Sequence, residues 1–343
     1  MANLKKVSVV GATGYTGVEV TRFLLRHPHV QIARLTTSQP QGFPLRTLLP
    51  EVHAAQTQNI VTYDKADVIK NSDVVFLCLP HTEAMQHAGS FLEAGKTVID
   101  LSADFRLKNA AEYPTWYNVE HLTPKLLAQS VYGLTEFYRD ALKTADLIAN
   151  PGCYPTSALL ALLPLVKKKL VDLNTIVINA ASGVSGAGKK PSATTHFCEV
   201  QDNYLAYKVA RHQHTPEVEQ ILGEAAGQSV KVDFLTHLLP VNRGILASVY
   251  AKKSSGTTEE KIRAAYEEFY GKSLFVRLRK AGEYPSLKDV QYSNFCDIGV
   301  TLNQRTGTVT VLSAIDNLVK GAAGQAVQNF NVRYKFFRRL LFS

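Results

Sequence analysis

The first half of the chain alternates between short apolar runs and segments whose apolar residues recur at helical spacing. Four runs predict strands, at 6–10, 31–38, 73–80 and 96–102. A helix is predicted after the first strand by Val18, Val20, Phe23, Leu24 and Leu25. Because alternating strands and helices build a mostly parallel sheet covered on both faces, we expect an α/β domain of the Rossmann type.

The second half of the chain contains more strands. They are predicted at 175–180, 232–237, 245–251, 275–278, 298–302 and 308–314, with an amphipathic helix over 259–270. This pattern predicts an α+β domain whose sheet makes a subunit interface. A chain of 343 residues accommodates two domains. We expect a nucleotide-binding domain over 1–148, completed by 312–343, and a catalytic and oligomerisation domain over 149–311.

A cysteine lies in a tight turn between two apolar runs near the middle of the chain. The run 147–149 predicts a strand end, Pro151-Gly152 predicts a turn, and 157–163 predicts a helix. Cys153 should therefore lie at a helix N-terminus, where the helix dipole and free N–H groups stabilise a thiolate. The alternative is a buried structural cysteine.

The first predicted strand runs directly into a glycine-rich turn and then a helix. This is the context of a dinucleotide-binding fingerprint, although the spacing is G-x-x-G-x-x-G rather than G-x-G-x-x-G. Glycines let the backbone approach a pyrophosphate, and the helix N-terminus offers N–H groups to it. The expected cofactor residues are Gly11, Thr13, Gly14, Tyr15, Thr16 and Gly17. The alternative is a glycine turn without a ligand.

The end of the second predicted strand indicates which dinucleotide binds. An NAD site usually has an acidic residue there, which bonds the ribose 2′-OH. Here Thr37, Ser38 and Gln39 occupy that place, and hydroxyl groups can bond a 2′-phosphate without repelling it. We therefore expect NADP(H), with Ser38 at the phosphate and Arg34 or Arg46 as possible sources of positive charge.

Several loops carry residues suited to an anionic substrate. Arg106 can clamp a phosphate or carboxylate, or it can form a salt bridge with Asp104 or Asp100. The segment 182–190 is glycine-rich and basic, and we expect a flexible loop that binds an anion or serves as a linker. Residues 81–83 are expected to cap the next helix.

A histidine-rich segment precedes another predicted helix. Thr215 is the predicted N-cap and Pro216 the first helical residue, which leaves His212 in an extended segment, free to point into a cleft. The pairs His196-x-Cys198 and His212-x-His214 have spacings that zinc ligands can use, but no supporting pattern accompanies them and we expect no metal.

Charge and composition restrict the class of protein. The formal net charge of +9 favours anionic partners, but the basic residues are dispersed apart from a run at 333–339, which a terminal helix explains. We therefore expect small anionic metabolites and no nucleic acid. The apolar runs are too short to span a bilayer, and no signal peptide precedes the first strand. Four widely spaced cysteines indicate a reducing cytoplasm.

These motifs together resemble the N-acetyl-γ-glutamyl-phosphate reductase family, which is related to aspartate-semialdehyde dehydrogenase. The resemblance rests on the glycine turn 11–17, the nucleophile motif 150–156, the glycine loop 182–188, the segment 212–217 and the closing segment 316–321. It implies that His212 is the acid/base. It also implies that Ser182 and Gly183 bind substrate, and that Ser185, Gly186 and Asn317 contact the cofactor. Gln213 departs from the family's usual arginine.

The resemblance implies an activity. The Cys153 thiolate attacks an acyl phosphate, phosphate leaves, and NADPH reduces the thioester to a semialdehyde in arginine biosynthesis. A homo-oligomer, dimer or tetramer, is expected. The nearest alternative is a sister reductase acting on aspartyl phosphate or carrier-bound aminoadipyl phosphate. A remote alternative is a catalytically silent NADP-binding sensor.

Overall fold

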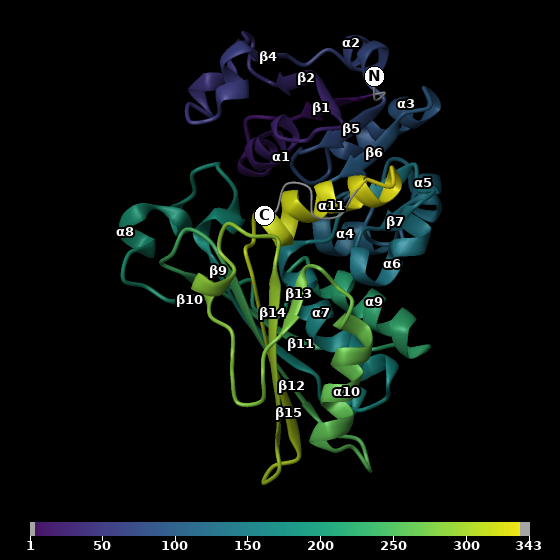
Figure 1. The fold of residues 1–343 in the computed structure, drawn as a ribbon, viewed down its shortest axis with the longest axis vertical. Coiled ribbons are helices and arrows are strands. Elements are labelled where there is room, and N and C mark those ends of the chain that lie inside the picture. Colours follow the sequence, from purple (N-terminus) through teal and green to yellow (C-terminus); the bar gives the residue numbers. More distant parts are fainter. Residues whose placement is uncertain (1–3, 337–343) are drawn as a thin grey trace. The chain divides into compact units, whose positions relative to one another are not determined.

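The computed structural model describes residues 4–336 (Figure 1). The chain divides into two compact units. Unit 1 comprises Met1–Gly152 and Ala322–Ser343, and unit 2 comprises Cys153–Gly321. The chain therefore leaves unit 1 directly before Cys153 and returns to it directly after Gly321. The last three residues of the basic run expected near the C-terminus, 337–339, lie outside the described residues.

Unit 1 is built on an eight-stranded sheet within the described residues. All neighbouring strands are parallel except the first pair. In spatial order they are β3 (Phe43–Pro44), β4 (Asn59–Thr62), β2 (Val30–Thr37), β1 (Lys5–Val10), β5 (Val74–Leu77), β6 (Thr97–Asp100), β8 (Leu147–Ala149) and β7 (Val131–Tyr132). The predicted α/β fold is confirmed, and the four predicted strands are β1, β2, β5 and β6.

The helices of unit 1 include one from the C-terminal part of the chain. They are α1 (Tyr15–Leu25), α2 (Lys65–Asn71), α3 (Ala88–Glu93), α4 (Glu112–Tyr117), α5 (Pro124–Gln129), α6 (Thr135–Leu142) and α11 (Gly324–Arg333). Helix α11 packs against α1 and α6, and its residues from Gly324 to Val332 are all buried. It follows a π-helical turn, Val319–Ala323. The C-terminal segment thus completes the core of unit 1.

Unit 2 contains a mixed seven-stranded sheet within the part of the chain that the structure describes. Its strands, in spatial order, are β10 (Leu205–Tyr207), β11 (Asp233–Leu239), β9 (Val177–Gly183), β12 (Ile245–Lys252), β15 (Thr308–Ile315), β14 (Cys296–Asn303) and β13 (Val276–Leu278). Its α-helices are α7 (Cys153–Lys167), α8 (Phe197–Val200), α9 (Thr215–Ala226) and α10 (Glu259–Tyr270). Helix α10 has the bounds that the amphipathic pattern predicts.

Helix α7 is the central helix of unit 2. Every residue from Tyr154 to Val166 is buried, and the helix packs against β12, β15, α9 and α10. Pro164 lies inside it, so the carbonyl of Leu160 loses its usual N–H donor four residues later. The Tyr270 hydroxyl from α10 donates to that carbonyl at 2.6 Å. A side chain from another helix thus compensates for a proline within α7.

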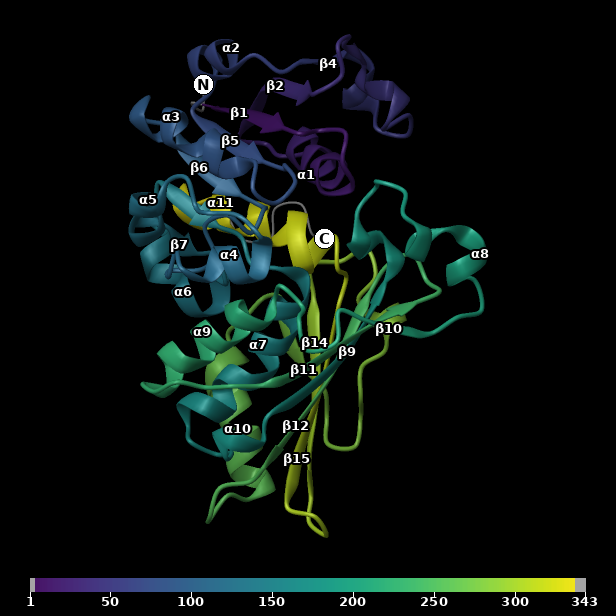
Figure 2. The same ribbon diagram turned by 180° about the vertical axis from the view of Figure 1, so that it is seen from behind.

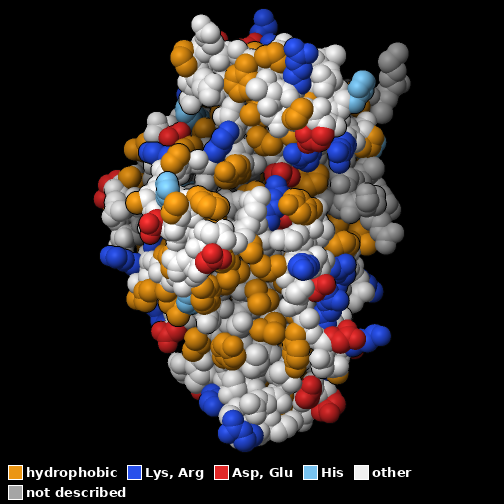
Figure 3. All heavy atoms as spheres, turned by 90° about the vertical axis from the view of Figure 1, so that its left-hand side faces the viewer, with side chains coloured by type: hydrophobic (Ala, Val, Ile, Leu, Met, Phe, Trp, Pro, Cys, Tyr) orange, Lys and Arg blue, Asp and Glu red, His pale blue; other side chains and the backbone are white. Residues whose placement is uncertain are grey.

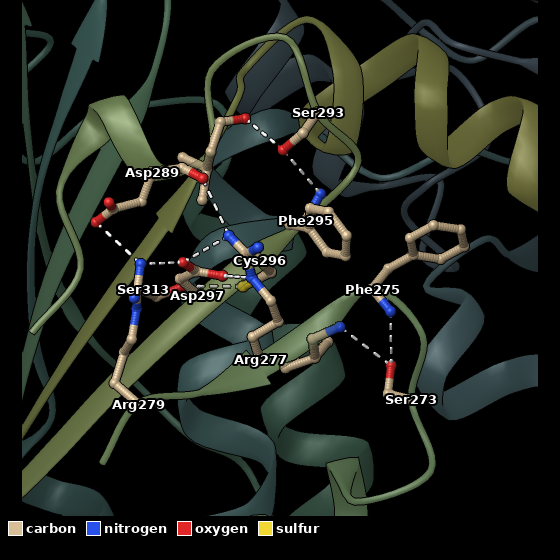
Figure 4. Close-up of polar contacts among 12 residues, drawn as sticks. Ser273, Phe275, Arg277, Arg279, Asp289, Ser293, Phe295, Cys296, Asp297 and Ser313 are labelled. Carbon is tan, nitrogen blue, oxygen red and sulfur yellow. Dashed lines mark hydrogen bonds and ion pairs between the residues drawn. The ribbon is translucent and has the colours of Figure 1, made fainter. Parts of the chain in front are cut away.

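Charged side chains tie the short edge strand β13 to β14 (Figure 4). Arg277 lies opposite Asp297 in the strand register, and its Nε is 2.5 Å from Oδ1. Arg279 Nη2 lies 2.6 Å from the other carboxylate oxygen of Asp297, which is fully buried. The Arg277 guanidinium also stacks over Phe295 at 4.1 Å from the ring centroid. The Asp297 carboxylate, bonded by both arginines, thus holds the edge strand β13 against β14.

Helices α7, α9 and α10 lie on one side of the unit 2 sheet, and α8 lies on the other side (Figures 1 and 2). Strand β12 alternates accordingly, with Ile245, Ala247, Val249 and Ala251 buried and the residues between them less so. Figure 3 views the molecule from the side away from α7, α9 and α10, and hydrophobic side chains are visible there. The segment around Tyr284 and Pro285 packs against this outer face at Gly299. Within the described residues, no helix is long and apolar enough to cross a membrane.

Candidate active site

The predicted nucleophile opens helix α7. Strand β8 ends at Ala149, three residues form the turn, and Cys153 is the first helical residue and partly exposed. The prediction that Cys153 lies at a helix N-terminus is confirmed. The helix dipole and the N–H groups at a helix N-terminus favour a thiolate at this position, and such groups can stabilise an oxyanion.

Asn150 holds the unit 1 side of this turn. Its main-chain N–H donates to the Asp100 carbonyl at 2.8 Å, and its side-chain amide donates to the Ala322 carbonyl at 3.1 Å. Its side-chain oxygen accepts from Asn329 Nδ2 at 3.1 Å. Residues from the first part of unit 1 and from its C-terminal segment therefore both hold Asn150, which precedes the turn to Cys153.

Gly321 packs directly against the nucleophile in unit 2. A Cβ added at Gly321 would lie 2.8 Å from Cβ of Cys153 and 3.2 Å from its Cα, which is closer than real carbon atoms approach. The Gly321 N–H donates to the Asp316 carbonyl at 2.9 Å, so a short turn holds the glycine in place. Only a residue without a side chain fits beside Cys153.

The histidine segment differs from the prediction. Helix α9 begins at Thr215 with His214 as its N-cap, and Pro216 is the second helical residue. The prediction that Thr215 is the N-cap was wrong, because proline is tolerated throughout the first helical turn and does not mark one position. His212 lies in a turn rather than an extended segment, since Thr215 N–H donates to its carbonyl at 2.9 Å.

The His212 ring is buried, with 5 % of its surface exposed, and does not point freely outward. Its Nδ1 accepts the main-chain N–H of His214 at 3.2 Å, and its Nε2 lies 3.3 Å from the Tyr207 hydroxyl. The rings of Tyr154 and Phe234 meet it edge-on, with centroids at 5.3 and 5.4 Å. The ring is thus fixed on several sides.

Two tyrosine hydroxyls continue from His212. Tyr207 from β10 donates to the Tyr154 hydroxyl at 3.2 Å, and Tyr154 donates to the His237 carbonyl at 2.9 Å. Burial raises the pKa of Tyr207 to about 12 and raises that of Tyr154 further, and a charge on Cys153 adds to both shifts. Both hydroxyls therefore keep their protons beside the nucleophile. Sequence reasoning missed both tyrosines, although Tyr154 directly follows Cys153.

The glycine loop of unit 2 is ordered rather than flexible. Ser182 and Gly183 end strand β9, and Val184–Ala187 forms a 3₁₀ turn. Gly183 N–H donates to the Gly244 carbonyl at 2.8 Å, and a Cβ at Gly183 would lie 2.6 Å from the Asn242 carbonyl oxygen. The expected flexible loop is wrong for 182–187, because these main-chain contacts hold it against the start of β12.

Asn317 joins this loop to the closing segment. Its Nδ2 donates to Ser185 Oγ at 3.0 Å, and its Oδ1 accepts the Gly244 N–H at 2.8 Å. A Cβ on Gly186 would meet Ser182 Oγ at 3.0 Å and Asn317 Nδ2 at 3.5 Å. The structure therefore brings together Ser182, Gly183, Ser185, Gly186 and Asn317 within unit 2.

The glycine turn of unit 1 has the geometry that close backbone packing requires. Gly11 has φ +85°, and a Cβ there would lie 2.3 Å from the Cys78 carbonyl oxygen. A Cβ on Gly17 would lie 2.2 Å from the Gly11 carbonyl oxygen. Helix α1 begins at Tyr15, and its N-cap Gly14 supplies no side-chain bond. Thr13 lies in the turn and Thr16 in the first turn of α1, whose N-terminus can face a ligand.

The two arginines considered for binding a 2′-phosphate, Arg34 and Arg46, have different surroundings. Ser38 directly follows the strand and is exposed. Arg34 forms a bidentate pair with Asp67, with Nη2 at 2.9 Å from Oδ1, and this hydrogen bonding raises the pKa of Arg34. Arg46 is exposed in the 3₁₀ turn Leu45–Thr47. Arg34 is thus paired with a carboxylate, and Arg46 lies in an exposed turn.

Arg106 is buried in unit 1 and bonds the main chain. Its Nε donates to the Asn150 carbonyl at 2.8 Å and its Nη2 to the Leu101 carbonyl at 3.0 Å. Burial, followed by the charge of Asp104, raises the pKa of Asp100 to about 7, and the Arg106 charge opposes this. Arg106 thus supports the strand ends around the nucleophile turn.

Residues 81–83 precede the 3₁₀ helix Ala84–Gln86, and Glu83 is its N-cap, as predicted, although it supplies no side-chain bond. The carboxylate of Asp104 accepts Thr82 N–H at 2.7 Å and Met85 N–H at 2.9 Å. His81 accepts the Ala103 N–H through Nδ1 at 3.1 Å. His196 and Cys198 belong to helix α8 and its N-cap rather than to a strand. Among residues 4–336, no three His, Cys, Asp or Glu side chains are placed to hold a metal.

Comparison with solved structures supports this fold. Aspartate semialdehyde dehydrogenase II of Vibrio cholerae is similar with a TM-score of 0.72 at 16 % identity, covering 97 % of this chain and 98 % of that one. The enzyme of Candida albicans, solved with NADP, gives a TM-score of 0.70 at 17 % identity, over 96 % and 98 %. At these identities the likeness establishes the fold.

Sequence comparison is more specific. The family model of the semialdehyde dehydrogenase NAD binding domain matches residues 6–145, and that of the dimerisation domain matches residues 153–317. N-acetyl-gamma-glutamyl-phosphate reductases are 50 % identical in Pelotomaculum thermopropionicum, over 95 % of this chain and 94 % of that one, and 48 % in Geobacter sulfurreducens, over the same shares. With both domains matched and relatives this similar over nearly their whole length, the chain belongs to the N-acetyl-gamma-glutamyl-phosphate reductase family.

Proposed function

We propose that this protein reduces N-acetyl-γ-glutamyl phosphate to N-acetylglutamate semialdehyde and phosphate with NADPH, through a thioester on Cys153, in arginine biosynthesis. The observation that carries the proposal is Cys153 as the first residue of α7, in a chain half identical to reductases of that name. A thiolate at a helix N-terminus is the arrangement that acyl transfer to cysteine requires.

The residues of unit 1 fit a dinucleotide. A side chain at Gly11 or Gly17 would clash with neighbouring backbone atoms. Helix α1 begins directly after this turn, so its N-terminus can face the ligand. Gly11, Thr13, Gly14, Tyr15, Thr16 and Gly17 would hold the pyrophosphate, Ser38 would bond the 2′-phosphate of NADP(H), and Ser185, Gly186 and Asn317 would contact the cofactor from unit 2. When bound, NADPH supplies a hydride.

Cys153 performs the covalent steps. Its thiolate forms a bond to the acyl carbon, the bond from that carbon to the phosphate oxygen breaks, and phosphate leaves with the electron pair. N–H groups at the start of α7 stabilise the oxyanion of the tetrahedral species. After reduction of the thioester carbon the carbon–sulfur bond breaks, and the thiolate and the semialdehyde are released. Arg106, Ser182 and Gly183 are proposed to bind the substrate's anionic and carbonyl groups.

His212 is proposed as the acid/base that manages the thiol proton. To accept a proton on Nδ1, its ring must give up the His214 N–H, a contact that at 3.2 Å is at the long limit of a hydrogen bond. His214, two residues on, is the alternative base. Variants of the two histidines distinguish these assignments.

A homo-oligomer, formed through the outer face of the unit 2 sheet, completes the proposal. That face bears partly exposed hydrophobic side chains, and the matching family model is described as a dimerisation domain. We place the protein in the cytoplasm, where Cys153 stays reduced. Light scattering of the purified protein measures the oligomer, and Tyr250→Lys on β12 should weaken it.

The test of the function is semialdehyde-dependent reduction of NADP⁺ in the presence of phosphate, with Cys153→Ser as the control. Turnover on N-acetylglutamate semialdehyde far above that on aspartate semialdehyde supports the proposal. Faster turnover on aspartate semialdehyde assigns the chain to a sister reductase of aspartyl phosphate. Turnover only on a carrier-bound aminoadipate semialdehyde assigns it to a sister reductase of aminoadipyl phosphate. Absence of turnover on all three indicates a silent NADP-binding sensor.

A further inference from the structure

The hydrogen bonds around His212 determine which of its nitrogens carries the proton. Nδ1 faces the main-chain N–H of His214 at 3.2 Å, and an N–H can only donate, so this nitrogen accepts. A neutral imidazole has one donor and one acceptor. Neutral His212 therefore has its proton on Nε2.

The hydrogen bonds of Tyr154 and Tyr207 lead independently to the same tautomer of His212. The His237 carbonyl can only accept, so Tyr154 must donate to it, at 2.9 Å. The Tyr207 hydroxyl then uses its own hydrogen toward Tyr154 at 3.2 Å. Its lone pairs remain for the His212 Nε2–H at 3.3 Å. Every bond in the chain therefore points from His212 toward the His237 carbonyl.

We propose that Tyr207, supported by Tyr154, is a positioning residue that anchors the His212 ring at Nε2 and keeps it in the Nε2–H tautomer, so that Nδ1 accepts the thiol proton once it gives up the His214 N–H. This deepens the proposed function and rests on it for its kinetic part. The two tyrosines come from different elements, β10 and the first turn of α7, so the pair also links the histidine turn to the helix that carries Cys153.

The chemistry requires such a support. An imidazole can rotate about its side-chain bonds and exchange tautomers, and only one arrangement presents the correct nitrogen to a reacting group. Tyr154 is 2 % exposed and His212 is 5 % exposed, whereas Tyr207 is partly exposed, so water has little access to the buried end of this hydrogen-bond chain. Removing the Tyr207 hydroxyl leaves the Nε2–H without that acceptor and the Tyr154 oxygen without that donor.

The kinetic test compares Tyr207→Phe with Tyr204→Phe, a matched control on an exposed tyrosine that stacks on His237 instead. Tyr207→Phe should lower kcat about tenfold, the order of one hydrogen bond, with KM values unchanged. The double variant Tyr207→Phe/His212→Asn should be no slower than His212→Asn alone, because the tyrosine acts through the histidine. Multiplying effects in the double variant, or equal effects of the two phenylalanine variants, would overturn the proposal.

A second measurement does not depend on turnover. Proton–nitrogen correlation spectra of histidine-labelled enzyme, assigned by comparison with His212→Asn, report the tautomer directly. The wild type should show His212 protonated at Nε2, and Tyr207→Phe should show a mixture or a shifted Nε2 signal. A wild-type Nδ1–H tautomer, or a signal that Tyr207→Phe leaves unchanged, contradicts the proposal even if the enzyme turns over a different acyl phosphate.

Discussion

The main-chain N–H of His214 donates to Nδ1 of His212 at 3.2 Å, so the first of these histidines depends on the backbone of the second. The side chain of His214 takes no part in that bond. Substituting residue 214 therefore keeps the support of His212 as long as the turn keeps its shape. Asparagine suits this turn, because residue 214 is the N-cap of α9 and asparagine is among the preferred N-cap residues.

Substitution of the two histidines should have different effects. His212→Asn should lower turnover roughly a hundred- to ten-thousandfold, as expected for loss of an acid/base, with the fold unchanged. His214→Asn should alter mainly stability or substrate affinity. Steady-state kinetics and urea unfolding separate the two outcomes. If His214→Asn abolishes turnover and His212→Asn does not, His214 is the base; if neither matters, the helix N-terminus alone activates the thiol.

Replacing the nucleophile should remove the chemistry alone. Cys153→Ala should lose turnover while NADPH binding and the fold remain, because the thiol packs at a helix end rather than in the core. Isothermal calorimetry with NADPH and single-turnover assays test this. Residual activity above roughly a thousandth of the wild type is incompatible with covalent catalysis by this residue.

Alkylation provides an independent test of the same cysteine. Iodoacetamide should label Cys153 before the other three, since Cys296 is buried and burial raises the pKa of the Cys78 thiol. Cys198 is exposed and is the only competitor expected, so Cys198→Ala is the matched control. Mass spectrometry that finds Cys153 unmodified while Cys198 reacts contradicts an activated thiol.

The cofactor preference follows from the uncharged end of β2. NADP(H) should bind at least tenfold tighter than NAD(H), about 1.4 kcal/mol. Ser38→Asp should shift the preference toward NAD(H), because a carboxylate repels a 2′-phosphate and bonds a 2′-OH. Arg46→Ala should weaken NADP(H) alone, and Arg34→Ala, whose guanidinium is paired with Asp67, is its control. Equal wild-type affinities for the two dinucleotides contradict this interpretation.

Stability should depend on pH through Asp100. Burial and Asp104 raise its pKa to about 7, so the folded protein binds a proton there more tightly than the unfolded chain does. Stability from this group is therefore lost as the pH rises from about 4 to 7. Asp100→Asn mimics the protonated acid, and its unfolding free energy relative to the wild type should increase between pH 5 and pH 8. Parallel urea-unfolding profiles for the two proteins contradict the assignment.

Tyr270 should contribute to the stability of α7. Tyr270→Phe leaves the Leu160 carbonyl without the donor that compensates for Pro164, at a cost of about 1–3 kcal/mol. Tyr204→Phe, at an exposed tyrosine, is the control and should have little effect. Urea unfolding measures both. A loss no larger than that of the control shows that another group satisfies this carbonyl.

The features that could be predicted are those that depend on residues close together in the sequence. The turn before Cys153 and the turn at Gly11 each combine a strand, glycines and a helix within a few residues, and both lie where the patterns indicate. Contacts across the chain were not predictable. The main-chain bonds to Asp104, the bond from Tyr270 to a proline-interrupted helix, and the position of Tyr207 beside His212 all depend on the folded arrangement.

The histidine turn shows why position within a short motif is harder to predict than its presence. Thr215 and Pro216 correctly indicate a helix start, but threonine is acceptable both as a cap and within the first turn, so the helix begins one residue earlier than expected. That shift places His214 at the cap position.

The contact between Gly321 and Cys153 has a consequence for how this protein can evolve. Alanine at 321 would bring its methyl carbon within 2.8 Å of Cβ of Cys153, and α7, which is buried along nearly its whole length, has no room to retreat. The position of Cys153 is therefore restricted by the Gly321 backbone as well as by α7. A lineage that enlarges residue 321 must also rebuild the start of α7, whereas Cys153 can lose its sulfur without any change at residue 321.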